Sequence, residues 1–154
     1  MGSGKSLRAV EPDCVSISVA LMMAQTSLAA RRSEALKVFW NDCGRGVEAR
    51  SPQTCGLEEA WNIWSDEVRG IQGNFLGLVD PRGNVVQFYF EASIPNSVDD
   101  AEHLRIVRLD CPVPAERGSY VRPATIGEVA RIIEQVYTVG AIDPRSLDTK
   151  FDPW

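Results

Sequence analysis

The feature that most constrains the fold is a pair of β-forming runs joined by a short turn. Residues 74–80 form the first run, Asn-Phe-Leu-Gly-Leu-Val-Asp, and residues 84–91 form the second, Asn-Val-Val-Gln-Phe-Tyr-Phe-Glu. Between them, Pro81 presets the backbone for the second turn position and Gly83 accepts a left-handed conformation. Because β-branched and aromatic residues flank this turn on both sides, the sequence predicts an antiparallel hairpin over residues 74–91.

Side chains of the second run alternate between the two faces of the predicted strand. Val86, Phe88 and Phe90 share the more apolar face, which we expect to lie against the core. The opposite face carries Val85, Gln87, Tyr89 and Glu91. In the first run, Gly77 has no side chain to pack, which indicates a bulge or the close approach of another element.

Periodicity predicts further elements along the chain. Strands are expected at residues 14–21, where the front of a longer helix is equally compatible, and at residues 104–109. Helices are expected from Thr26 to Trp40, from Leu57 to Arg69 and from Thr125 to Thr138. We expect connections at residues 44–53, 92–103 and 110–123, a flexible start over residues 1–12 and an irregular tail over residues 141–154.

The two later helices have clear sequence boundaries. Thr125 and Glu128 have the spacing of a capping box, and Gly140 supplies a stop. The earlier helix has Thr54 as its expected N-cap and Gly70 as its stop. Its apolar stripe, which we expect to pack in the core, is Leu57, Trp61, Trp64 and Val68.

The order of these elements predicts the fold class. Strands that follow one another through a hairpin pair antiparallel, and the helices then gather on one side of the sheet. The chain has 154 residues, which is the size of one ordinary domain. We therefore predict a single α+β domain over residues 1–154, with two layers: an antiparallel sheet and helices packed mainly on one face.

Charge and cysteine usage narrow the function classes. Sixteen basic and twenty-one acidic residues give a net charge of -5, which disfavours binding to nucleic acid or to anionic membrane surfaces. The four cysteines include no CxxC pair, which is typical of free thiols in a reducing compartment. Lys5 and Arg8 precede an apolar run as in a secretory signal, but Glu11 and Asp13 interrupt that pattern. We therefore expect a cytoplasmic protein that holds no metal and no cofactor.

The sequence contains few residues arranged for catalysis. Its single histidine, His103, lies in an acidic connection, where neighbouring carboxylates favour the charged imidazolium over a general base. The helix acids stand in adjacent pairs whose members diverge, as on a solvated face: Glu58 with Glu59, and Asp66 with Glu67. We therefore predict that the protein is not an enzyme.

A partial resemblance links the second half of the chain to a known family. The hairpin with its Gly77 and Gly83, the Gln87-Phe88-Tyr89 run, and Gly118-Ser119-Tyr120 before a helix resemble bacterial immunity proteins of polymorphic secreted toxin systems. The resemblance covers about residues 74–140. It implies a small cytoplasmic α+β domain that binds a cognate toxin, often a deaminase or nuclease, and blocks its active site without catalysis.

Such a toxin would have a basic active-site cleft, which an acidic surface could recognise. The densest negative run outside the helix starts is the connection with Asp99, Asp100 and Glu102, flanked by Glu91 and Asp110. Tyr89 or Tyr120 would supply the aromatic anchor that affinity requires. The alternative for this connection is a merely solvated loop. The next candidate face is the helix that carries Glu58, Glu59, Asp66 and Glu67.

Other function classes remain open at this point. An adaptor domain would also present a binding surface without catalysis. A small-molecule-binding domain would instead have a deep apolar pocket with convergent polar groups between the sheet and the helices.

Overall fold

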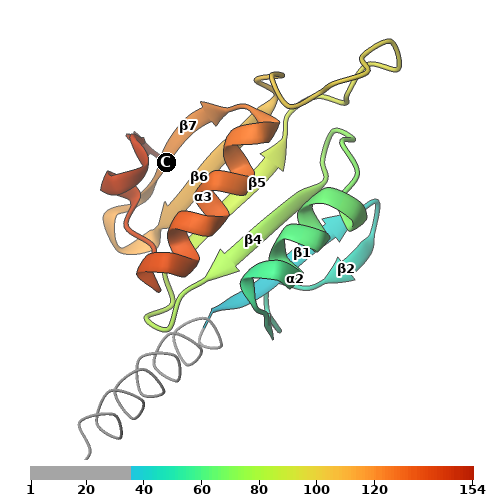
Figure 1. Cartoon of the computed structure of the whole chain (residues 1–154). Coiled ribbons are helices and arrows are strands. Elements are labelled where there is room, and N and C mark those ends of the chain that lie inside the picture. The colour runs from blue at the N-terminus through green and yellow to red at the C-terminus, as the bar shows by residue number, and fades with distance from the viewer. Residues whose placement is uncertain (1–35) are drawn as a thin grey trace, which may run out of the picture. The chain divides into compact units, whose positions relative to one another are not determined.

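A computed structural model describes residues 36–154 of the chain. Within this part the chain forms an eight-stranded antiparallel sheet and two α-helices, so the α+β prediction is confirmed (Figure 1). The strand or helix expected at residues 14–21, the flexible start expected over residues 1–12 and the first part of the helix expected from Thr26 lie outside the described residues.

The sheet follows the order β2-β1-β4-β5-β6-β7-β8, and the short β3 also pairs with β1. Every pairing is antiparallel. The strands are β1 (Lys37–Asp42), β2 (Arg45–Val47), β3 (Gln53–Thr54), β4 (Phe75–Val79), β5 (Val85–Phe90), β6 (Val107–Val113), β7 (Gly118–Ala124) and β8 (Lys150–Pro153).

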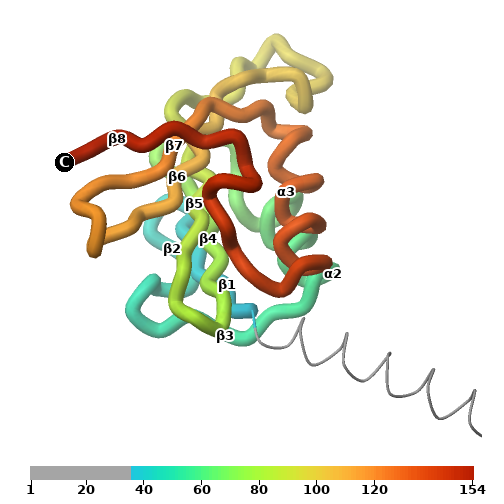
Figure 2. Tube along the Cα trace, turned by 90° about the vertical axis from the view of Figure 1, so that its left-hand side faces the viewer, coloured from blue at the N-terminus to red at the C-terminus, as the bar shows by residue number. Residues whose placement is uncertain are grey.

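Both α-helices lie on the same side of the sheet, as the sequence predicts (Figure 2). They are α2 (Leu57–Asn62), which continues into the π-helical turn η1 (Ile63–Glu67), and α3 (Ile126–Val139). Two short 3-10 turns complete the described elements, η2 (Pro114–Glu116) and η3 (Pro144–Leu147). No helix within residues 36–154 is long and apolar enough to cross a membrane.

The predicted hairpin is present as β4 and β5. The Asp80 carboxylate, which is buried, fixes its turn: it accepts hydrogen bonds from the backbone N–H groups of Arg82 (2.9 Å) and Asn84 (2.8 Å). It also accepts from the Ile142 N–H at 3.0 Å, which ties the C-terminal segment to the hairpin. Gly83 has a φ of 85°, the left-handed conformation that the sequence predicts.

The core lies between the sheet and the helices. Val86, Phe88 and Phe90 face it, as predicted, and the Trp64 ring stacks on Phe90 with centroids 5.1 Å apart. Trp64 and Val68 of the predicted stripe are buried, whereas Leu57 and Trp61 are partly buried against the core. The core side of α3 comprises Val129, Ile132, Ile133, Val136 and Tyr137. Both helices therefore contribute to one core.

Hydrogen bonds join the two helices to each other and to the chain before α2. The Trp61 indole N–H donates to the Ala130 carbonyl (3.1 Å), and the Tyr137 hydroxyl donates to the Cys55 carbonyl (2.7 Å). The capping box of α3 forms as predicted between Thr125 and Glu128. The N-cap of α2 is Gly56, so the prediction of Thr54 as its cap was wrong.

The prediction of a helix reaching Trp40 was wrong, because residues 37–42 form β1. Leu36, Phe39 and Trp40 have a spacing that fits a helical stripe, but the strand places Phe39 and Trp40 on opposite faces. Phe39 lies directly opposite Gly77 of β4, and a Cβ atom on Gly77 would overlap the Phe39 ring. This contact confirms the close approach that Gly77 indicates.

Two predicted connections and the tail predicted to be irregular also contain strands, which corrects the prediction there. Residues 44–53 include β2 and the start of β3, residues 110–123 include the end of β6 and most of β7, and the tail includes η3 and β8. Pro112 lies beyond Asp110, the last β6 residue paired with β5, and Pro123 lies beyond Val121, the last β7 residue paired with β8. Each proline therefore lies where its strand has one neighbour, which tolerates the missing N–H. The strand expected at residues 104–109 begins at Val107 and runs to Val113.

Candidate functional site

The predicted acidic loop lies beside the N-terminus of α3. Asp99, Asp100 and Glu102 are all exposed. The Glu102 carbonyl accepts from the Gly127 N–H at 2.9 Å, and the Glu102 N–H donates to Asp100 Oδ1 at 3.0 Å. Acidic side chains near a helix N-terminus are stabilised by the helix dipole. The loop therefore has a structural reason to be acidic, independent of any partner. His103 is exposed on the same loop.

The other residues predicted with this loop do not share one surface. Tyr89 pairs with Arg108 across β5 and β6, on the sheet face away from the helices, where it is exposed. Tyr120 pairs with the buried Cys111 and therefore points to the helix side. Its hydroxyl donates to Glu116 at 2.9 Å. The two proposed anchors thus lie on opposite faces of the sheet.

Two predicted acids remain near Tyr89. Asp110 pairs with Gln87 on the face away from the helices, and its Oδ2 lies 3.9 Å from Arg108 Nε. Its Oδ1 is buried and has no hydrogen-bond partner within the described residues. Glu91 lines a small depression with Arg108. Arg108 therefore pairs with Asp110, and its Nη2 also lies 3.4 Å from Asp152 Oδ2.

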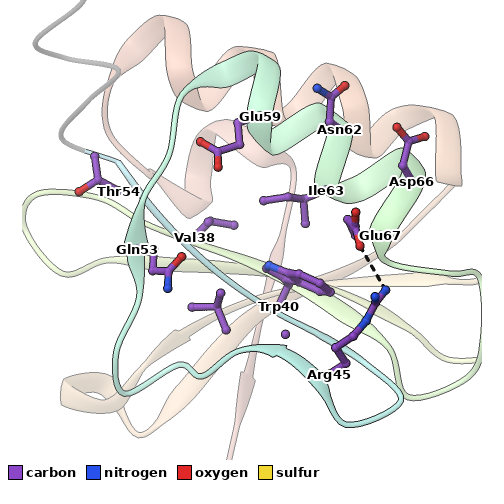
Figure 3. Close-up of a pocket in the computed structure, with 12 residues that line it drawn as sticks. Val38, Trp40, Arg45, Gln53, Thr54, Glu59, Asn62, Ile63, Asp66 and Glu67 are labelled. Carbon is purple, nitrogen blue, oxygen red and sulfur yellow. Dashed lines mark hydrogen bonds and ion pairs between the residues drawn. The ribbon is translucent and has the colours of Figure 1, made fainter.

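A larger groove lies between α2–η1 and the edge of the sheet formed by β1, β2 and β3 (Figure 3). It encloses about 560 Å³. Trp40 and Val38 form its floor, and Ile63 lies above them. Its lining also includes Arg45, Gly46, Val47, Gln53, Thr54, Glu59, Asn62, Asp66 and Glu67. Sequence analysis placed three of these acids on the second candidate face, but it did not find the groove, because Trp40 was expected in a helix.

The groove combines an aromatic floor with an acidic rim. Glu59, Asp66 and Glu67 line it together with Arg45; the Glu59 and Glu67 carboxylates point toward the groove, whereas the Asp66 side chain points away from Trp40 (Figure 3). Arg45 closes one end: its Nη2 lies 3.1 Å from Glu67 Oε2, and its Cζ lies 5.9 Å from the centroid of the Trp40 ring. The Arg45 side chain is nevertheless 68% exposed. The groove therefore suits a positively charged group that also has an apolar or planar part.

The π-helical turn η1 carries Asp66 and Glu67, two of the acids on the helix side. In η1 the Val68 N–H donates to the Ile63 carbonyl at 2.9 Å, five residues earlier. The Ser65 hydroxyl donates to the Trp61 carbonyl (2.9 Å), an acceptor that a regular helix gives to the Ser65 N–H. A π-helical turn rotates the residues that follow it, and such turns are frequent at functional sites.

A buried polar cluster holds the floor of the groove in place. The Asp42 carboxylate at the end of β1 is buried, and it accepts from Arg69 Nε (3.1 Å) and from Asn74 Nδ2 (2.6 Å). The hydrogen bond from the Arg69 side chain holds the pKa of Asp42 below its ordinary value of 3.8. Asn74 Oδ1 in turn accepts from the Cys43 N–H at 2.8 Å. These bonds hold the β1–β2 turn, and with it the backbone at Arg45, against the segment after η1.

A second cavity of about 440 Å³ lies near the start of the C-terminal segment. Arg82 and Arg145 line it together with Tyr120, Glu116 and Asp143. Its charges are mixed, with two guanidinium groups and two carboxylates. Within residues 36–154 there is no group of three or more His, Cys, Asp or Glu side chains arranged to hold a metal ion.

Comparison with known proteins identifies no relative of this chain. No protein-family model, no curated protein and no solved structure matches the chain.

Proposed function

We propose that the protein is an immunity protein, a cytoplasmic and non-catalytic domain that binds a cognate secreted bacterial toxin and occludes its active site. The sequence resemblance over residues 74–140 suggests this class. The observation that carries the proposal is the groove beside α2, because it joins an aromatic floor to the Glu59 and Glu67 carboxylates at the edge of the sheet (Figure 3).

The negative charge of the protein supports the proposal that its partner is basic. The chain has a net charge of -5, and the groove adds a local excess of carboxylates over guanidinium groups. A toxin that acts on nucleic acid, such as a nuclease or a deaminase, needs a basic cleft to hold its substrate. Opposite charges on the two proteins would accelerate association and select this partner over others.

Trp40 supplies the second element of a binding surface. Interface energy concentrates in a few residues, most often tryptophan, tyrosine and arginine, that lie in partly enclosed pockets. Trp40 is partly buried against the core and lies at the base of the groove. A side chain of the toxin could bury this ring completely, which the exposed acidic loop could not offer.

A small-molecule-binding domain is the alternative. The second cavity has a volume within the usual range for ligand pockets, and Arg82 and Arg145 could hold an anionic ligand there. Such a ligand would raise the melting temperature of the protein, and an Arg82→Ala variant would lose that effect.

Co-expression tests the proposed function directly. The toxin to use is sought among the neighbouring genes, as the variable C-terminal domain of a large secreted protein. We expect that induction of the toxin stops growth, that co-expression of this protein restores it, and that the purified proteins form a stable complex. An unrelated toxin is the control and should remain lethal. Failure of rescue, with both proteins expressed and folded, would contradict the proposal.

A further inference from the structure

We infer that the groove is a receptor for an arginine side chain of the basic partner, and that Arg45 occupies this receptor until the partner displaces it. This inference rests on the proposed function, since it names the chemical group that the toxin inserts.

The contacts of Arg45 show that the groove accommodates a guanidinium group. The Arg45 guanidinium lies over the face of Trp40 at 5.9 Å and beside Glu67 at 3.1 Å. A planar cation gains from both contacts at once, because the ring face is negative and the carboxylate can take a forked pair of hydrogen bonds. Arg45 makes both contacts from one end of the groove. A guanidinium group delivered from outside could meet the same ring and the same carboxylate.

The groove has more negative charge than Arg45 neutralises. Within residues 36–154, Glu59 takes part in no ion pair, and its carboxylate points toward the groove (Figure 3). Asp66 also has no ion pair there, but its side chain points away from Trp40 (Figure 3). An additional cation would therefore find at least the Glu59 carboxylate without a basic partner among the described residues. On the face around Tyr89, Arg108 instead pairs with both Asp110 and Asp152.

The Arg45 side chain is also placed so that it can move out of the groove. Arg45 follows the two-residue turn Cys43–Gly44, and its side chain is 68% exposed. An ion pair this exposed is weakly held, so a partner that brings its own guanidinium with buried apolar contacts can replace it. In the same position Arg45 Nη2 also lies 3.7 Å from Asp42 Oδ2, so Arg45 leaves two carboxylates when the partner displaces it.

Two pairs of variants test the exchange in the complex with the toxin. Arg45→Ala removes the internal occupant, whereas Arg50→Ala removes an equal charge from an arginine that pairs with Glu48 outside the groove. We expect Arg45→Ala to tighten toxin binding about fivefold relative to Arg50→Ala, since the partner no longer competes with an exposed ion pair. If Arg45→Ala binds the toxin more weakly than Arg50→Ala does, Arg45 is not displaced by an arginine of the partner.

The second pair tests the carboxylates. The double variant Glu59→Gln/Glu67→Gln should weaken toxin binding by about tenfold or more, because it removes charges that face the inserted cation. The matched control Asp99→Asn/Asp100→Asn removes the same charge from the acidic loop and should change affinity less than about threefold. Circular dichroism and melting temperature establish that all variants are folded. If the native protein binds toxin but the two double variants are equivalent, the proposed function stands and the groove assignment fails.

A probe without the toxin tests the receptor even if the proposed function is wrong. In nuclear magnetic resonance titrations with a tri-arginine peptide, the indole N–H signal of Trp40, assigned with a Trp40→Phe variant, should shift. The shift should be larger in Arg45→Ala and absent with a tri-citrulline peptide. Shifts confined to residues 92–103 would overturn the inference. So would a dimeric free protein whose Trp40 signal moves on dilution, because the occupant would then be a second copy.

Discussion

Replacing Gly77 by Ala tests the pairing that turns Trp40 toward the groove. Phe39 of β1 lies directly opposite Gly77 of β4, and its ring covers the position that a side chain would occupy. A one-residue slip of β1 against β4 would exchange the faces of Phe39 and Trp40 and remove the floor of the groove. The contact between Phe39 and Gly77 therefore links the register of the sheet to the proposed binding site.

The size of the effect follows from two opposing contributions. An alanine Cβ would overlap Cζ, Cε1 and Cε2 of the Phe39 ring, and forcing an extra group into a packed site costs about 1–3 kcal/mol. Gly77 does not have a positive φ, so alanine also recovers about 0.5–1 kcal/mol of backbone entropy. We expect Gly77→Ala to lower the free energy of unfolding by about 1–2 kcal/mol.

A double-mutant cycle isolates this contact. Leucine lacks the three ring atoms that alanine would overlap, so Gly77→Ala should cost almost nothing, or should stabilise, in a Phe39→Leu background. Urea denaturation followed by circular dichroism measures each free energy, and an unchanged m-value indicates that the same surface is exposed on unfolding. If Gly77→Ala costs the same in both backgrounds, within about 0.5 kcal/mol, the contact does not restrict residue 77 and the reasoning is wrong.

Three further predictions concern single groups. Tyr137→Phe should lower the free energy of unfolding by about 1–2 kcal/mol in urea titrations, because it leaves the buried Cys55 carbonyl without its donor; no loss would contradict this. The hydrogen bond from the backbone N–H of Thr125 holds the pKa of Glu128 below its ordinary value of 4.5. Glu128 therefore stabilises the fold above pH 4.5, and this contribution disappears as the pH falls through the lower pKa of the folded state. The melting temperature of Glu128→Gln should therefore lie below that of the native protein at neutral pH and converge with it in acid; a constant difference would refute the assignment. Iodoacetamide at neutral pH, with peptide mapping, should modify the exposed Cys43 well before Cys55, because burial raises the pKa of the Cys55 thiol to about 11; equal rates would contradict the burial of Cys55.

Local signals made much of the fold predictable from sequence. The hairpin, the capping box and the apolar stripes each need only a few neighbouring residues to be recognised. They predicted β4, β5, α3 and most of the α2–η1 segment, and the class of the fold followed from their order.

The first described strand was not predictable in the same way. Leu36, Phe39 and Trp40 fit helical spacing, whereas in the strand Phe39 fills the space beside Gly77, far along the chain, and Trp40 lies on the other face. The pairing partner therefore overrides the local pattern. The end of β6 and most of β7 were missed because prolines indicated a connection, whereas Pro112 and Pro123 lie where their strands have one neighbour. β8 was missed because the tail shows no periodicity.

The candidate site was predictable only in part. The acids on the helix were recognised as a possible binding face, but nothing in their spacing showed that Trp40 and Arg45 lie beneath them. That arrangement requires the β1–β2 turn to bring Arg45 back beside Trp40, through pairing of Val47 with Trp40 and of Arg45 with Asp42. The acidic loop was conspicuous in sequence because its charges lie within four positions, yet the predicted tyrosine anchors lie on opposite faces of the sheet.

Hydrogen–deuterium exchange of the protein with and without its toxin tests the binding groove most directly. The measurement compares amide protection across residues 36–154 at saturating toxin concentration. We expect the toxin to slow exchange in β1, in β2 and in the segment from Leu57 to Glu67, while residues 92–103 exchange as in the free protein. Slower exchange confined to residues 92–103, or to the segment around Arg82 and Arg145, would contradict the groove as the site at which the partner binds.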